Sequence, residues 1–409
     1  MGYKSTFSNI EIKEVIKMDK AVLFESIKKV MKEAFDNINN SNDIKKIYND
    51  NNYDFNEDIE DLENILYEEI NTCYKKIEEK EKMNFNNDDN IVKLLDSDSG
   101  KYEVFVLIPI FNASAEMAER CIYSIMDNFR GTNYKIITIT NKELDIFKNK
   151  DFLGIPHVVF KKNRFSLPEA YNYMIDYARS NKKDENTIIS LMDDDAYILS
   201  GQNSKIKDGI EKIKKDEYIA VSGHYYDITP VKTKFQAIIN ETHTQEFSTL
   251  YRKPYCHGGA CFMMKLNKFP FNGLPIDGLG GISINILEIN EASNPRDKWY
   301  LYNDPSFLVF HPRKSNLFSW IATYLSYEIA WNRALDMLDE EKYIIWREKI
   351  KETSQERVKG LYKKLLNKDE RLYVLGNLYL TRYFKPLLRD NLYYIEFKNY
   401  KISTHINLK

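Results

Sequence analysis

Four apolar, strand-like segments alternate with helical segments between residues 102 and 192, and this alternation constrains the fold more than any other feature. The apolar segments lie at 102–110, 135–140, 157–160 and 187–192, and the first is rich in Val, Ile and Phe, as is typical of a strand buried on both faces. Helical patterns fill the intervals, and Pro168 suits the first turn of one of them. Strands that alternate with helices predict an α/β fold with a mostly parallel sheet and right-handed crossovers.

The regions on either side of this segment have a different character. Residues 1–98 are charged, rich in Asn and free of proline, and their apolar residues recur at helical spacing. Residues 317–409 are mainly helical in pattern and dense in Tyr, Trp and Leu. The polar stretch 84–90, followed by a second one at 96–100, is the best candidate linker. We therefore predict a helical N-terminal region at 1–98, an α/β domain at 99–316 and a mainly helical C-terminal region at 317–409.

Composition excludes several classes of protein. The 59 Lys and Arg nearly balance the 61 Asp and Glu, so the net charge of -2 lacks the basic excess of a protein that binds long nucleic acids. The four cysteines show no paired spacing, which argues against a disulfide framework or a zinc cluster. No apolar run reaches the ~18 residues of a membrane span, and the N-terminus lacks a secretory signal. We expect a cytoplasmic protein without a transmembrane segment. A homo-oligomer is compatible with these features.

Three consecutive aspartates, Asp193, Asp194 and Asp195, follow the apolar segment 187–192. Adjacent carboxylates repel one another unless a cation is near. On an extended segment Asp193 and Asp195 share one side while Asp194 faces the other. Two carboxylates on one side suit Mg²⁺ or Mn²⁺, which prefer oxygen ligands and keep positions open for phosphate. The alternative is a solvated turn, because aspartate is common where strands end.

The segments around the triplet resemble a known family. The stretch 104–125, VFVLIPIFNASAEMAERCIYSI, looks like the opening strand and helix of family 2-type glycosyltransferases, with Pro109 and Asn112 on the nucleotide-binding turn. The stretch 161–178, KKNRFSLPEAYNYMIDYA, is similar to an Asn- and Gly-containing helix of that family and carries Asn163 and Asn172. Phe165 and Tyr173 replace two of the family's glycines. The resemblance implies a GT-A fold: an α/β, Rossmann-like catalytic domain with a mostly parallel sheet, extended here by helical N- and C-terminal regions.

The same resemblance implies roles for particular residues. It places Asp193 and Asp194 on the donor side, and Asp193 and Asp195 at the metal. The stretch 304–315, DPSFLVFHPRKS, resembles the strand that ends in a metal-ligating histidine in several GT-A families, including the polypeptide N-acetylgalactosaminyltransferases. His311 would then be the third protein ligand, and the basic pair that follows would neutralise the leaving diphosphate (Arg313, Lys314). The stretch 257–265, HGGACFMMK, is similar to the acceptor-side strand (His257, Gly258, Gly259).

The general base is the least defined part of the predicted site. An inverting enzyme needs an Asp or Glu to take the proton of the acceptor hydroxyl. In one alignment Asp277 supplies it. In another, Gly278 to Gly281 resembles the W-G-G-E segment of galactosyltransferases, and Ile282 and Ser283 stand where those families have acids. Asp277 before Gly278 is also a common turn pair.

The sequence therefore predicts a metal-dependent glycosyltransferase that moves a sugar from a nucleotide-diphosphate sugar, a UDP-sugar by resemblance, to an acceptor hydroxyl. The expected cofactor is Mn²⁺ or Mg²⁺. The acceptor stays open among a glycan, a lipid-linked glycan, a protein and a modified nucleobase. Two alternatives stay open as well. One is a nucleotidyltransferase, although no glycine-rich basic phosphate loop follows the first strand. The other is a non-catalytic GT-A-like binding module, which the missing acid at 282–283 favours.

Overall fold

The computed structural model divides the chain into two compact units. One consists of Met1–Glu81, Asn316–Leu325 and Leu361–Lys409, and the other of Lys82–Ser315 and Ser326–Gly360. The structure describes residues 20–80, 91–111, 113–162, 167–218, 220–226, 231–239, 261–269, 301–312, 316–317, 320–321, 359–366 and 370–391. Whether the three predicted regions are separate domains stays a proposal.

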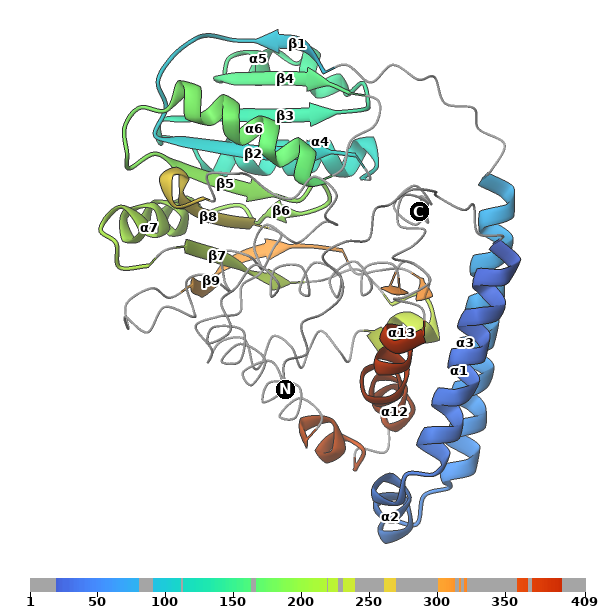
Figure 1. The fold of residues 1–409 in the computed structure, drawn as a ribbon. Coiled ribbons are helices and arrows are strands. Elements are labelled where there is room, and N and C mark those ends of the chain that lie inside the picture. The colour runs from blue at the N-terminus through green and yellow to red at the C-terminus, as the bar shows by residue number, and fades with distance from the viewer. Residues whose placement is uncertain are drawn as a thin grey trace, which may run out of the picture. The chain divides into compact units, whose positions relative to one another are not determined.

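The second unit is built on one large sheet (Figure 1). Within the described ranges its nine strands lie in the order β1-β4-β3-β2-β5-β8-β7-β9-β6. In chain order the strands are β1 Val92–Asp96, β2 Val104–Ile110, β3 Tyr134–Thr140, β4 His157–Lys161, β5 Ile188–Met192, β6 Tyr197–Ile198, β7 Ala220–Tyr226, β8 Cys261–Lys265 and β9 Leu301–Phe310.

Strand directions bring several carboxyl ends to the same edge of this sheet. β4, β3, β2 and β5 are parallel neighbours. β8 runs antiparallel to both β5 and β7, so β7 has the direction of β5. β9 is parallel to β7 and therefore also ends at the carboxyl edge of β5. The residues after β5 and β9, far apart in the sequence, thus come to one edge of the sheet.

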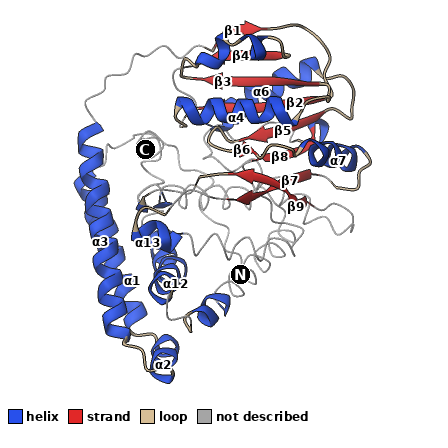
Figure 2. Ribbon diagram, turned by 180° about the vertical axis from the view of Figure 1, so that it is seen from behind, coloured by secondary structure: helices blue, strands red, loops and turns tan. Residues whose placement is uncertain are grey.

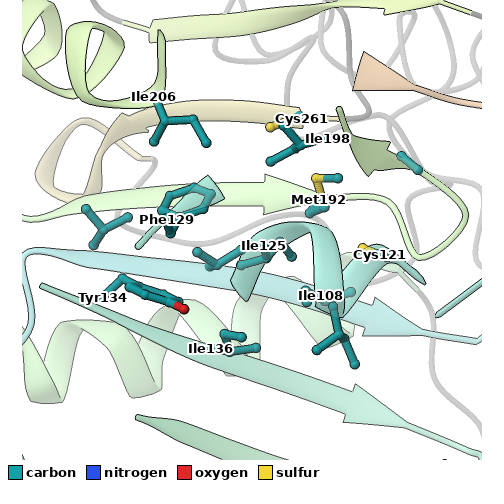
Figure 3. Packing of buried hydrophobic residues seen from close by; sticks show 14 of the residues in the cluster. Ile108, Cys121, Ile125, Phe129, Tyr134, Ile136, Met192, Ile198, Ile206 and Cys261 are labelled. Atoms are coloured by element: carbon teal, nitrogen blue, oxygen red, sulfur yellow. The ribbon is translucent and has the colours of Figure 1, made fainter. Parts of the chain in front are cut away.

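Helices cover both faces of the sheet (Figures 1 and 2). Alternate residues of β2 point to opposite faces. On one face Val104, Val106 and Ile108 pack with α4 (Ala115–Asn128) and α7 (Asn203–Lys214), as part of the cluster in Figure 3. On the other face Phe105 and Leu107 pack with α6 (Leu167–Asn181). Both faces of β2 are buried, as the apolar run 102–110 predicts.

The predicted fold class is confirmed: a Rossmann-like α/β sheet flanked by helices, with helical N- and C-terminal parts. The strands β4-β3-β2-β5 are parallel, and so are β7 and β9. β8 is antiparallel to both of its neighbours, β5 and β7, and the edge strands β1 and β6 are antiparallel to β4 and β9. β1 lies within 1–98 but belongs to this sheet, as an exposed and bulged edge strand. The five residues of β1 are mostly exposed and do not form a long apolar run. The sequence therefore did not indicate this strand. The short elements are η2 (Asp145–Lys148), α5 (Lys150–Leu153) and η3 (Leu266–Lys268).

The first unit is helical. Its described elements are α1 Lys20–Asn39, α2 Asn42–Asp50, α3 Phe55–Lys80, α12 Arg371–Leu378, the π-helical segment η4 Tyr379–Phe384, and α13 Lys385–Asn391. A partly buried ion pair joins its N- and C-terminal parts: Arg371 Nη2 lies 3.1 Å from Asp58 Oδ1, and the Tyr48 hydroxyl donates to Asp58 at 2.8 Å. Among the described helices, none is long and apolar enough to cross a bilayer.

Candidate metal and donor site

The three aspartates form the connection between β5 and β6. β5 ends at Met192, and β6 begins at Tyr197. β6 pairs antiparallel with the end of β9, so that Tyr197 faces Phe310. Their rings stack with centroids 4.7 Å apart. This pairing brings His311, the residue after β9, next to the aspartates.

Asp193, Asp195 and His311 form one cluster. The Nε2 atom of His311 lies 3.4 Å from Asp193 Oδ2 and 3.3 Å from Asp195 Oδ1. One ligand atom from each residue can be chosen so that all three lie within 4.8 Å of one another. The side chain of Asp195 is 15% exposed and that of Asp193 is 34% exposed, so Asp193 is on the open side of the cluster.

This donor set fits a divalent cation. Two carboxylates and an imidazole are ligands that Mn²⁺ accepts, and Mg²⁺ prefers oxygen. Ligand atoms at ~2.1 Å from one ion lie up to about 4.2 Å apart, so atoms within 4.8 Å need only small movements to share it. Three protein ligands leave coordination positions for phosphate oxygens. Asp193, Asp195 and His311 are therefore the residues that could hold the metal.

The two carboxylates shift the proton equilibrium of His311. Burial lowers the pKa of the imidazole, but hydrogen bonds to Asp193 and Asp195 and their negative charges outweigh burial and raise the pKa to about 9. Without a cation the ring is therefore protonated near pH 7 and neutralises part of the acidic charge. A divalent cation at the same place would replace that proton.

Asp194 faces away from the cluster. Its Oδ2 accepts hydrogen bonds from the backbone amides of Phe111 and Ala113, both at 2.9 Å. These two residues belong to the turn between β2 and α4, which follows Pro109, a buried residue of β2. Two aspartates of the triplet thus belong to the cluster, and the third binds the predicted nucleotide-binding turn.

Of the other predicted site residues, the structure describes Asn172 but not the rest. Asn172 lies half-buried on α6. The remaining donor-side, acceptor-side and base candidates lie outside the described residues: Asn112, Asn163, His257, Gly258, Gly259, Asp277, Arg313 and Lys314.

Two residues near the site were not indicated by the sequence. Tyr197 positions the β5–β6 connection through its stack on Phe310. Lys142, just after β3, donates a hydrogen bond from Nζ to the carbonyl of Ala113. A usable signal existed for Lys142, because it follows an apolar strand whose carboxyl end lies at the ligand-binding edge of a parallel sheet.

Replacing Tyr197 with alanine tests whether the β6–β9 pairing shapes the cluster. We expect the variant to bind Mn²⁺ roughly 3- to 10-fold more weakly, because an aromatic pair contributes about 0.5–1.5 kcal/mol. Isothermal titration calorimetry measures this, with Tyr123→Ala as the matched control, since Tyr123 lies exposed on α4. Equal Mn²⁺ affinities in both variants would show that the stack has no part in forming the site.

Comparison with known proteins gives a family for part of the chain. Residues 105–270 match the family model described as Glycosyl transferase family 2. That segment begins in β2 and includes the aspartate triplet, but it ends before β9 and so does not include His311. It covers less than half of the 409 residues. Residues 105–270 are thus similar to family 2 glycosyltransferases. No curated protein sequence matches the chain.

Solved glycosyltransferase structures show a more distant similarity. The mannosyltransferase PcManGT from Pyrobaculum calidifontis, in complex with GDP-Man and Mn²⁺, has 12% identity and a TM-score of 0.43, covering 85% of this chain and 95% of that one. S. aureus TarS 1–349 in complex with UDP-GlcNAc has 11% identity and a TM-score of 0.38, covering 73% of this chain and 92% of that one.

Proposed function

We propose that this protein is a metal-dependent glycosyltransferase that transfers a sugar from a nucleotide-diphosphate sugar to an acceptor hydroxyl. The observation that carries the proposal is the cluster of Asp193, Asp195 and His311 at the carboxyl edge of the sheet. The match of residues 105–270 to the family 2 model supports the reaction class. Subgroup features of the galactosyltransferases and polypeptide N-acetylgalactosaminyltransferases stay part of the proposal.

The residues of the cluster have a defined task in this reaction. Asp193, Asp195 and His311 would hold Mn²⁺ or Mg²⁺, which when bound supplies a positive charge against the leaving diphosphate. Asp193, on the open side, faces the donor. Charge that develops on the diphosphate is stabilised by preorganised groups that need not rearrange during the reaction. In the proposal Arg313 and Lys314 add to this stabilisation, and Asp277 acts as general base.

The donor and acceptor define the remaining parts of the proposal. We propose a UDP-sugar as donor, on the resemblance of the segments that contain Pro109, Asn112, Asn163 and Asn172. A hexosyl or N-acetylhexosaminyl group would be transferred. The acceptor is one of a glycan, a lipid-linked glycan, a protein or a modified nucleobase, with His257, Gly258 and Gly259 on its side of the site. A cytoplasmic location and a homo-oligomeric state are further predictions.

A panel of donors tests the function. The protein is incubated with Mn²⁺ and single nucleotide sugars, including UDP-GlcNAc and GDP-mannose, and the release of nucleoside diphosphate is measured with and without EDTA. We expect release from at least one donor, and its loss in EDTA. Pyrophosphate release from a sugar phosphate and a nucleoside triphosphate would instead identify a nucleotidyltransferase. Donor binding without turnover in the presence of acceptor mixtures would identify a binding module.

A further inference from the structure

Asp194 is the middle residue of the triplet, but its carboxylate contacts a different part of the fold from its neighbours. Both hydrogen bonds that it accepts end on Oδ2 and come from residues 83 and 81 positions earlier in the chain, Phe111 and Ala113. Asp194 is therefore a tertiary link between the β5–β6 connection and the turn after β2.

The need for this link follows from the strand pairing. β2 and β5 are parallel neighbours, and their paired register ends at Leu107 and Leu191. Beyond that point the backbone of β5 no longer pairs with β2, although β2 continues to Ile110. Beyond the last backbone pairing of β2 and β5, the Asp194 side chain accepts the hydrogen bonds of two backbone amides of the turn.

The turn is held from its other neighbour as well. The backbone amide of Asn141 donates to the carbonyl of Ile110 at 3.4 Å, and Lys142 Nζ donates to the carbonyl of Ala113. Both residues follow β3, the strand on the opposite side of β2 from β5. The amides of Phe111 and Ala113 are thus bound by the connection after β5, and the carbonyls of Ile110 and Ala113 by the connection after β3.

We propose that Asp194 is a positioning residue for the donor nucleotide: it does not bind the metal, but it fixes the turn at Phe111 and Ala113 against the metal-binding connection. This inference rests on the proposed function, because the turn must bind a nucleotide for its position to matter. It assigns separate tasks to the three aspartates. Asp193 and Asp195 hold the cation, and Asp194 sets the distance between the cation and the nucleotide.

Three substitutions at one position test the inference. Asp194→Asn keeps an oxygen that can accept both amides, Asp194→Glu keeps the charge but moves it by one methylene, and Asp194→Ala removes both. Calorimetry gives the Kd of UDP and of GDP at saturating Mn²⁺, and the Kd of Mn²⁺ without nucleotide. We expect Ala and Glu to weaken binding of the preferred nucleotide ~10- to 100-fold, because both hydrogen bonds to the turn are lost or displaced. Asn keeps an acceptor for both bonds and should weaken binding less than about 3-fold. Mn²⁺ binding should change less than about 3-fold in all three.

The controls separate the alternatives. Asp195→Asn should lose Mn²⁺ binding, which shows that the assay detects loss of a ligand. If Asp194 acts by charge on the donor, Glu will keep nucleotide affinity and Asn will lose it, and the inference is wrong. If the role is only structural, melting temperature and both affinities will fall together. If Asp194→Ala does not fold, the contrast between Asn and Glu decides.

Wild-type protein that binds neither nucleotide contradicts the proposed function and this inference together. Unchanged nucleotide binding in the Ala and Glu variants contradicts only the inference.

Discussion

Asp195→Ala is expected to lower the rate of nucleoside diphosphate release about 10²- to 10³-fold while leaving the fold intact. Asp195 is the less exposed carboxylate of the cluster and lies 3.3 Å from His311 Nε2. Its removal leaves one carboxylate and one imidazole, and a bound metal contributes several kcal/mol to charge stabilisation, with ~1.4 kcal/mol for each factor of ten in rate.

The matched control for this substitution is Asp145→Ala. The Asp145 side chain is 97% exposed, and its carboxylate lies 3.9 Å from Lys148 Nζ. The control should keep wild-type turnover, and both variants should melt within a few degrees of the wild type. Turnover that survives in Asp195→Ala, or that is equal with and without EDTA, would contradict the metal role of the cluster.

The second large effect is the pH dependence of metal affinity. Metal binding requires a neutral imidazole, whereas His311 in the metal-free protein has a pKa raised to about 9 by Asp193 and Asp195. Protons therefore compete with the metal below that pH. We expect the Kd of Mn²⁺ to fall roughly 50-fold between pH 7 and pH 9 and to level off above it. Calorimetric titrations at half-unit intervals of pH measure this, and a Kd independent of pH would contradict it.

As pH rises, the affinity for Mn²⁺ should increase, whereas the stability of the metal-free protein should decrease. A raised histidine pKa stabilises the folded state below the unfolded value of about 6.5, and that contribution is lost as pH rises through about 9. The melting temperature without metal should therefore fall between these values, and the melting temperature with saturating Mn²⁺ should not. His311→Gln, which cannot be protonated, should remove both pH dependences. Wild-type dependences that persist in that variant would assign them to another group.

The parallel part of the fold could be predicted from the sequence because its signals are local. The runs that form β2, β3, β4 and β5 are apolar and separated by helical patterns, and α6 begins beside Pro168. The direction of β8 could not be predicted, because an apolar run such as Cys261–Lys265 is the same whichever way the strand runs.

The site was predictable in the same uneven way. The shared side of Asp193 and Asp195 was expected from alternation along an extended segment. The structure instead has a turn, in which the amide of Ala196 donates to the carbonyl of Asp193 at 3.1 Å, and it still places both carboxylates beside His311. The bonds from Phe111 and Ala113 to Asp194 could not be predicted, because they join residues more than 80 positions apart. The pairing of Tyr197 with Phe310 is also long-range, and β6 has only two residues, too few for a strand signal.

A crystal structure of the protein with Mn²⁺ and the preferred nucleoside diphosphate tests the central claim most directly. We expect one anomalous manganese peak at ~2.0–2.3 Å from a carboxylate oxygen of Asp193, a carboxylate oxygen of Asp195 and an imidazole nitrogen of His311. Diphosphate oxygens should complete the coordination, with Asp194 still bound to the amides of Phe111 and Ala113. A peak elsewhere in the protein, or a bound nucleotide with no manganese at these three residues, would contradict the account.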